Sequence, residues 1–115
     1  MAQRSNESAI QQAIRFLSRG PIRLFRNNTG ALKDQGGRLV RYGLCTGSSD
    51  LIGWRTITIT PDMVGTTVAV FTAIEVKDHS KPTPEQEAFI ATVQAAGGIA
   101  GVARSTDDAR HILGM

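Results

Sequence analysis

The sequence predicts a mixed α/β (α+β) fold with a mixed sheet, in the order helix, three or four strands, helix, strand, helix (α-β-β-β-α-β-α in its shortest form). Three observations predict it. The length of 115 residues suits one hydrophobic core. The composition, with 41% hydrophobic and 20% charged residues, is that of an ordinary globular protein. The apolar pattern changes along the chain between helical and extended periods. We therefore expect residues 1–115 to form a single domain.

The N-terminal segment from Ser5 to Arg19 is predicted to be a helix that ends at Gly20-Pro21. Apolar residues recur there on one helical face: Ile10, Ala13, Ile14 and Leu17. Glu7 lies near the first turn, at the edge of this face, where a carboxylate interacts favourably with the helix dipole. Two interpretations of Glu7 stay open, a ligand of a functional site or a simple N-terminal charge.

The next segment combines short strands with a polar connection. Residues 22–26 are a strand candidate, and residues 39–44 resume an extended pattern. Between them, residues 27–38 contain three glycines and several basic groups, a composition typical of a loop, and such a loop could reach toward a ligand. We therefore expect two strands separated by a basic loop.

A polar turn at residues 46–49 places Asp50 at the start of the following strand, which runs from Leu51 to Thr60. Proline, aspartate and glycine at residues 61–65 mark the connection to a further strand over residues 67–77. These two strands are predicted to form an antiparallel hairpin or meander with a lengthened polar connection.

The C-terminal third contains the clearest helix start, Thr83-Pro84-Glu85-Gln86. It combines a threonine cap, proline at the first helical position and glutamine three residues after the cap. This helix is expected to stop at Gly97-Gly98. The segment from Ile99 to Ala103 then has the pattern of a buried strand. Ser105 opens a last short helix, which Gly114 closes.

The basic residues are unevenly distributed. Of 13 lysines and arginines, eight precede Cys45, and only two acidic residues lie in that part of the chain. Such a surface can bind the phosphate backbone of a nucleic acid, because each neutralised phosphate releases counterions. The alternative is a solvated surface that only maintains solubility. The candidate DNA-binding residues are Arg15, Arg19, Arg23, Arg26, Lys33, Arg38 and Arg41.

Composition also excludes several function classes. The apolar stretches are far shorter than the roughly 20 residues that cross a bilayer, so no membrane partner is expected. The first residues lack the apolar region of a secretory signal. A single cysteine, Cys45, permits neither an intrachain disulfide nor a cysteine metal cluster. We expect a cytoplasmic protein in which Cys45 is a small buried residue.

Two charged residues interrupt the apolar strand at residues 67–77. Glu75 and Lys77 are spaced by two, so their side chains share one face of the strand and Val76 points to the other. One interpretation is an exposed strand end where both side chains meet only water. The other depends on Asp50, at the start of a neighbouring strand, because two acidic side chains on adjacent strand ends can bind a hard cation such as Mg²⁺.

Such an ion would polarise a scissile phosphate and activate a water molecule. Lys77 would orient that nucleophile or stabilise the charge of the transition state. Glu7 could supply a further carboxylate. These residues therefore predict a catalytic centre for phosphodiester hydrolysis, made of Asp50, Glu75 and Lys77.

Asp50, Glu75 and Lys77 resemble the pattern of PD-(D/E)xK nucleases, and their surroundings resemble the VRR-NUC (virus-type replication-repair nuclease) domain. The resemblance covers almost the whole chain. The matching elements are Glu7 in the first helix, Gly47-Ser48-Ser49-Asp50-Leu51, Ile74-Glu75-Val76-Lys77, Ser80 to Gln86, and Gly97-Gly98-Ile99-Ala100-Gly101-Val102-Ala103.

This resemblance implies a restriction-endonuclease-like core and a site for Mg²⁺ or Mn²⁺. The implied metal ligands are Glu7, Asp50, Glu75 and the backbone carbonyl of Val76. Lys77 is the implied catalytic lysine. Gln86 matches a helical glutamine that supports the site, and it also fits one half of a capping box. One position departs from the family: Ser49 stands where a turn-shaping proline usually precedes the aspartate.

The resemblance further implies a homodimeric endonuclease acting on branched duplex DNA, similar to Holliday-junction resolvases, and a phage or prophage origin. A symmetric dimer would place two active centres on two DNA strands. The alternatives are a flap or nonspecific nuclease, a non-catalytic DNA-binding module of the same fold, and an α/β domain whose charged strand end has no function. The non-catalytic module predicts a replaced metal-site residue, and none is replaced.

Overall fold

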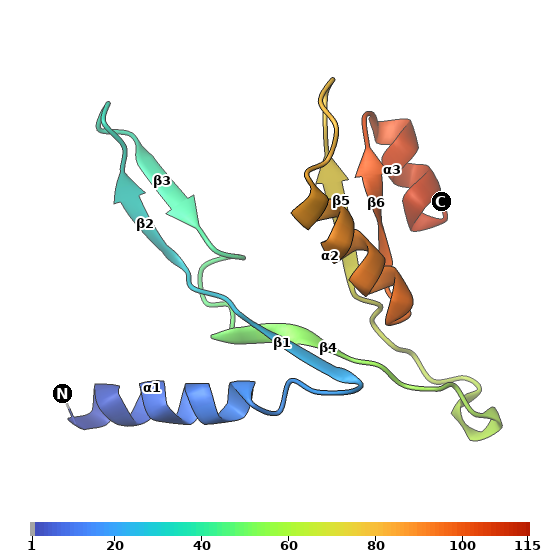
Figure 1. Cartoon of the computed structure of the whole chain (residues 1–115), viewed down its shortest axis with the longest axis horizontal. Coiled ribbons are helices and arrows are strands. Elements are labelled where there is room, and N and C mark those ends of the chain that lie inside the picture. Colours follow the sequence, from blue (N-terminus) through green and yellow to red (C-terminus); the bar gives the residue numbers. More distant parts are fainter. Residues whose placement is uncertain (1) are drawn as a thin grey trace. The chain divides into compact units, whose positions relative to one another are not determined.

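The computed structural model describes the backbone of residues 2–115 and the side chains of residues 6–115. Within that part of the chain, three α-helices and six strands form a mixed α/β protein with small sheets (Figure 1). The chain divides into two compact units, which are described separately: unit 1 runs up to Arg55, and unit 2 is Thr56–Met115. None of the described helices has the length and apolar character needed to span a bilayer.

Unit 1 begins with helix α1 (Ala2–Arg15). The predicted helix from Ser5 to Arg19 is therefore confirmed in part, and it starts and ends earlier. Tight turns follow it, with the Leu17 amide donating to the Ile14 carbonyl, because the left-handed Gly20 (φ 56°) and Pro21 redirect the chain. Since the helix begins at Ala2, Glu7 lies one turn further in than its sequence position suggested.

Two antiparallel strand pairs complete unit 1. Strand β1 (Ile22–Arg26) pairs with β4 (Leu51–Arg55), and β2 (Gly30–Lys33) pairs with β3 (Leu39–Tyr42). The predicted strand at residues 22–26 is thus confirmed, and the one predicted at residues 39–44 is confirmed up to Tyr42. The prediction of a basic loop over residues 27–38 is wrong at residues 30–33, because these form β2. Asp34 Oδ1 accepts from the Gly36 and Arg38 amides, so the glycines serve the tight turn that joins β2 to β3.

The apolar side chains of unit 1 are largely exposed within the single chain. Ile10 on α1 is 58% exposed, and Leu17, two residues after the end of α1, is 60% exposed, so their predicted burial on one helical face is not seen. Cys45 is also exposed, which corrects the expectation that it is buried. It lies in the turn between β3 and β4, where its backbone carbonyl accepts hydrogen bonds from Ser48.

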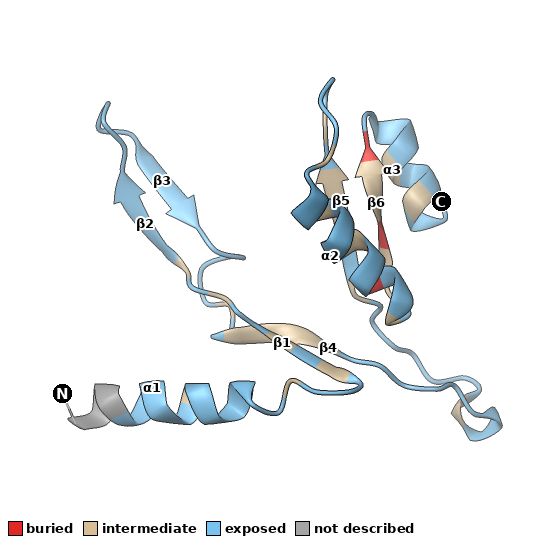
Figure 2. Cartoon of the chain, viewed as in Figure 1, coloured by how far each residue is buried: buried red, intermediate tan, exposed pale blue. Residues whose placement is uncertain are grey.

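Unit 2 is a β-α-β arrangement followed by a helix. Strand β5 (Thr72–Val76) is parallel to β6 (Ile99–Ala103), and helix α2 (Pro84–Ala95) connects them. Helix α3 (Thr106–Leu113) follows β6. The buried side chains, shown in red in Figure 2, are Val93 of α2 with Ala100 and Ala103 of β6. The predicted strand from Ile99 to Ala103 is confirmed, and its small residues allow both helices to approach it.

The helix ends of unit 2 confirm the predicted caps. Thr83 Oγ1 accepts from the Gln86 amide, and the Gln86 side chain accepts from the Thr83 amide, which completes a capping box. Ser105 Oγ accepts from the Asp108 amide at the start of α3. Gly114 ends that helix in the left-handed conformation, with φ 76°.

The predicted hairpin between residues 51–60 and 67–77 is wrong. Strand β4 stops at Arg55 and pairs with β1, whereas β5 begins at Thr72 and pairs with β6. Pro61–Met63 form a short 3-10 helix, η1, and Gly65 adopts a φ of 89°. The segment between β4 and β5 is therefore not a hairpin turn, because the two strands do not pair with each other.

Candidate active site

Glu75 and Lys77 lie together at the carboxyl end of β5. Because they are two residues apart on an extended strand, their side chains share one face. Lys77 Nζ is 3.7 Å from Glu75 Oε2, and the two side chains are 18% and 29% exposed, respectively. Val76 points away from them and is 74% exposed. Glu75 and Lys77 are therefore not a strand end that meets only water, which was the simpler interpretation of the sequence.

Gln86 connects the helix cap to this pair. Its Oε1 accepts from the Thr83 amide, and its Nε2 donates to Glu75 Oε2 at 3.1 Å. The sequence allowed Gln86 to cap α2, to support the proposed site, or both, and the structure shows that this one side chain caps α2 and donates a hydrogen bond to Glu75. Glu75 Oε2 thus faces two donors, while within residues 6–115 its Oε1 has no hydrogen-bond partner. That oxygen is available to a ligand.

Arg104 secures the backbone beyond Lys77 and was missed by the sequence reasoning. The Lys77 amide donates to the Ala103 carbonyl at 3.1 Å, which continues the β5–β6 pairing by one residue. Arg104 Nη1 then donates to the carbonyls of Asp78 and Ser80, at 3.2 and 3.0 Å. The only signal in the sequence was that Arg104 directly follows the strand parallel to β5. Its guanidinium holds the loop that leaves the lysine.

We expect Arg104→Ala to loosen this loop without unfolding unit 2. An exposed hydrogen bond contributes about 0.5–1.5 kcal/mol, so trypsin should cut after Lys77 roughly fivefold faster. Mass spectrometry of the released fragments measures this rate. Arg110→Ala is the matched control, because within residues 6–115 the Arg110 guanidinium is paired only with Asp107 of its own helix. Equal cleavage after Lys77 in the two variants would show that Arg104 does not hold the loop.

Asp50 and Glu7 both belong to unit 1. Asp50 directly precedes β4, is exposed, and accepts a hydrogen bond at its carbonyl from the Asn27 amide, at 2.8 Å. Glu7 is exposed on α1. Because Glu75 belongs to unit 2, the predicted acidic ligands are divided between the units. No three His, Cys, Asp or Glu side chains among the described residues are grouped so that they could hold a metal ion.

The candidate DNA-binding residues all lie in unit 1 and are all exposed. Within residues 6–115, none of them forms an ion pair with an acidic side chain. Their positions are Arg15 on α1, Arg19 before β1, Arg23 and Arg26 on β1, Lys33 on β2, Arg38 before β3 and Arg41 on β3. Their charges are therefore available to an anionic partner.

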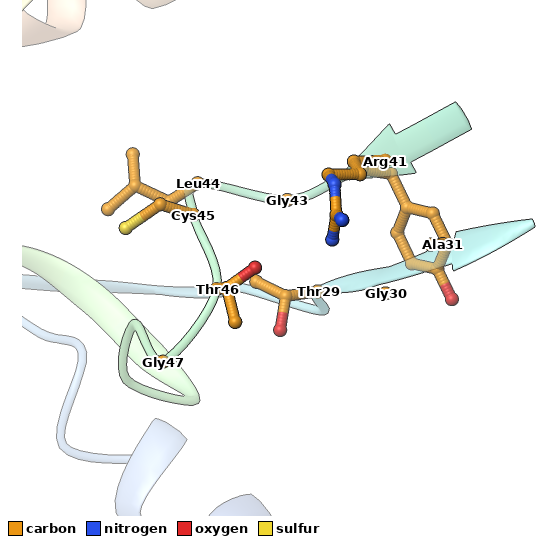
Figure 3. A pocket seen from close by; sticks show the side chains of 10 residues that line it. Thr29, Gly30, Ala31, Arg41, Gly43, Leu44, Cys45, Thr46 and Gly47 are labelled. Atoms are coloured by element: carbon orange, nitrogen blue, oxygen red, sulfur yellow. The ribbon is translucent and has the colours of Figure 1, made fainter. Parts of the chain in front are cut away.

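One of these side chains also lines a pocket between β2 and β3 and the turn that follows β3. Figure 3 shows the Arg41 side chain extending from β3 toward the segment at Thr29 and Gly30. Thr46 contributes a hydroxyl to the same hollow. A guanidinium beside two threonine hydroxyls can donate hydrogen bonds to a phosphate oxygen.

The order of the site residues is that of a PD-(D/E)xK nuclease: an aspartate before one strand, followed by a glutamate and a lysine on another. The model of the VRR-NUC domain family matches residues 5–107. The chain therefore belongs to the VRR-NUC family, as the sequence motifs indicated. No curated protein and no solved structure matches it.

Membership of this family makes the protein a nuclease of the PD-(D/E)xK type, and thus a hydrolase. It also implies a DNA substrate. Nucleases of this family typically use a divalent metal ion. Oxygen ligands such as the free Glu75 Oε1 and the exposed Asp50 carboxylate are the type that Mg²⁺ and Mn²⁺ prefer.

Proposed function

We propose that the protein is a metal-dependent DNA endonuclease whose catalytic residues are Asp50, Glu75 and Lys77. The observation that carries the proposal is the cluster at the end of β5. Lys77 and Gln86 both approach Glu75 Oε2, which fixes the orientation of the carboxylate and leaves Oε1 for a ligand. A purely structural ion pair would not need a second donor from the cap of a neighbouring helix.

The proposed ion is Mg²⁺ or Mn²⁺, held by the oxygens of Glu7, Asp50, Glu75 and the Val76 carbonyl. When bound, it would polarise the scissile phosphate and activate the attacking water. In this proposal Gln86 holds the Glu75 carboxylate in place through its hydrogen bond to Oε2. The acidic side chains of this proposed centre thus serve as oxygen ligands of the ion, and Gln86 positions one of them.

Lys77 supplies what the carboxylates lack, a positive hydrogen-bond donor. Its ammonium group orients the attacking water, or it donates to a phosphate oxygen as negative charge builds up in the transition state. Because the side chain is only 18% exposed, its charge acts through less water than a surface lysine's does. This low exposure favours a catalytic lysine over a lysine that only keeps the protein soluble.

We also propose that both units belong to a single nuclease domain, residues 1–115, with a restriction-endonuclease-like core. The family match supports this because it runs through both units without a break. The proposal requires Asp50 and Glu75 to bind the same ion. A structure determined with Mn²⁺ should place oxygens of both residues about 2.0–2.3 Å from it. Metal on only one of them would contradict the shared site.

The proposed substrate is branched duplex DNA, cut by a homodimer that carries one active centre for each of two strands. The test is incubation of the purified protein with a four-way junction and with a linear duplex of the same sequence, in Mg²⁺ or Mn²⁺. Paired nicks near the branch point are the expected products.

Equal cutting of the linear duplex would favour a nonspecific nuclease, and cutting of single-stranded flaps would favour a flap nuclease. Only monomer in sedimentation at micromolar concentration would count against paired nicking.

The exposed basic residues of unit 1 are proposed to bind the DNA backbone. Replacing both Arg38 and Arg41 by alanine should weaken binding and reduce its salt dependence. The slope of log affinity against log salt concentration should fall by about 0.9 for each lost phosphate contact. Fluorescence anisotropy in EDTA measures this without cleavage. Arg110→Ala should keep the full slope. An unchanged slope in the double variant would remove Arg38 and Arg41 from the interface.

A further inference from the structure

The segment that leads into Asp50 is held by one side chain from another part of unit 1. Residues 43–50 connect β3 to β4 without forming a strand. They lie against Asn27, which directly follows β1 and is half-buried. Sequence reasoning gave Asn27 no role, because it precedes the segment it touches by about twenty residues and belongs to no periodic pattern.

Asn27 makes four hydrogen bonds to this segment. Its backbone amide donates to the Asp50 carbonyl at 2.8 Å. Its side-chain Nδ2 donates to Ser48 Oγ at 2.7 Å and to the Ser49 carbonyl at 2.9 Å. Its Oδ1 accepts from the Leu44 amide at 3.0 Å. The donors and the acceptor of one amide side chain are thus all used on the residues just before the proposed metal ligand.

The rest of the segment is arranged around these bonds. Ser48 Oγ donates to the Cys45 carbonyl at 2.7 Å, and the Ser48 amide donates to the same carbonyl at 3.0 Å, which closes a turn. Gly43 has a φ of 86°, and a Cβ there would lie 2.6 Å from Thr29 Cα. Only glycine permits so close an approach of the two backbones. The segment is therefore fixed from both ends, by Gly43 and by Asn27.

We propose that Asn27 is a positioning residue that fixes the turn at residues 44–49 and so aims Asp50 at the metal ion. It acts through the backbone and touches neither ion nor substrate. It also accounts for Ser49, because the turn that proline stiffens elsewhere in the family is here stiffened by hydrogen bonds to Ser48 and Ser49. This inference rests on the proposed function, in which Asp50 binds the metal.

The experiment compares four variants with the unmodified protein. Asn27→Ala removes every side-chain bond. Asn27→Asp keeps the size of the side chain and the acceptor for Leu44, but it loses the two donated bonds. Asn28→Ala is the matched control, because in the part of the chain that the structure describes the Asn28 side chain has no hydrogen bond. Asp50→Asn tests the proposed function itself.

Two measurements are made on each variant. Calorimetry with Mn²⁺ gives the metal affinity, and hydrogen exchange in metal-free protein reports the protection of the Leu44 amide. Both Asn27 variants should bind Mn²⁺ about 10-fold more weakly, within the 10–100-fold that residues supporting a metal ligand contribute. Asn27→Ala should also expose the Leu44 amide, whereas Asn27→Asp should keep it protected. Asn28→Ala should match the unmodified protein in both measurements.

The two hypotheses fail in different ways. If Asp50→Asn loses Mn²⁺ binding while both Asn27 variants bind it like Asn28→Ala, the positioning role of Asn27 is wrong and the proposed function stands. If Asp50→Asn binds Mn²⁺ as well as the unmodified protein does, Asp50 is not a ligand, and both proposals fall. A loss of affinity in Asn27→Asp with Leu44 still protected supports positioning, because the bond to Leu44 is then kept and only the bonds to Ser48 and Ser49, next to Asp50, are lost.

Discussion

Replacing Lys77 by alanine is expected to lower the rate of DNA cleavage by about 10²–10³-fold, the effect of removing one donor that stabilises transition-state charge. The fold should survive. A partly exposed ion pair contributes about 0–1 kcal/mol, and Glu75 would keep its hydrogen bond from Gln86. Single-turnover cleavage of a labelled junction in Mn²⁺ measures the rate, and thermal unfolding checks the fold.

The matched control for Lys77→Ala is Lys81→Ala, an exposed lysine of the loop that follows β5. It should cut DNA at the normal rate, which would show that the loss is not a general effect of removing positive charge nearby. A Lys77→Ala protein that is folded and cuts within about threefold of the unmodified rate would disprove the catalytic role of this lysine, since one lost donor is worth far more.

The second large effect is a loss of Mn²⁺ affinity, expected when either of the proposed acidic ligands Asp50 and Glu75 is replaced. Asp50→Asn and Glu75→Gln should each weaken Mn²⁺ binding by more than about 100-fold, because replacing a ligand costs more than replacing a residue that supports one. Cleavage should be lost with the metal. If both residues bind one ion, the double variant should be little worse than either single variant, because each change already removes the shared interaction.

Calorimetry of the two single variants and the double variant completes this cycle. Glu85→Gln serves as the control, because Glu85 is an exposed acid in the first turn of α2 and has no place in the proposed site. Strictly additive losses would mean that Asp50 and Glu75 act on separate ions. That outcome would leave the family assignment intact and would refute the single shared centre.

Local signals in the sequence were reliable where a short motif determines structure. The threonine-proline start of α2 and the serine cap of α3 were predicted because capping involves residues only three apart. The common face of Glu75 and Lys77 likewise follows from the period of a strand. The VRR-NUC family was recognisable because its motifs keep their order over most of the chain.

Interactions between distant segments could not be predicted in the same way. The polar residues at 61–65 suit a hairpin turn as well as a longer connection. Which of the two they form depends on the strand that β5 pairs with, and that strand is β6, more than twenty residues further along the chain. The loops held by Asn27 and Arg104 depend on single polar side chains that reach backbone carbonyls 22 and 24 residues away. No periodicity marks such contacts, so only the folded chain reveals them.

The double role of Gln86 separates two demands on one position. A capping box is satisfied equally well by glutamine or glutamate, since either side chain accepts a hydrogen bond from the cap residue. Only glutamine also offers an amide donor, which Glu75 uses. A glutamate here would leave the helix start intact and set two like charges against each other. Helix stability alone cannot select between the two residues, so the identity of this side chain is set by charge balance around Glu75.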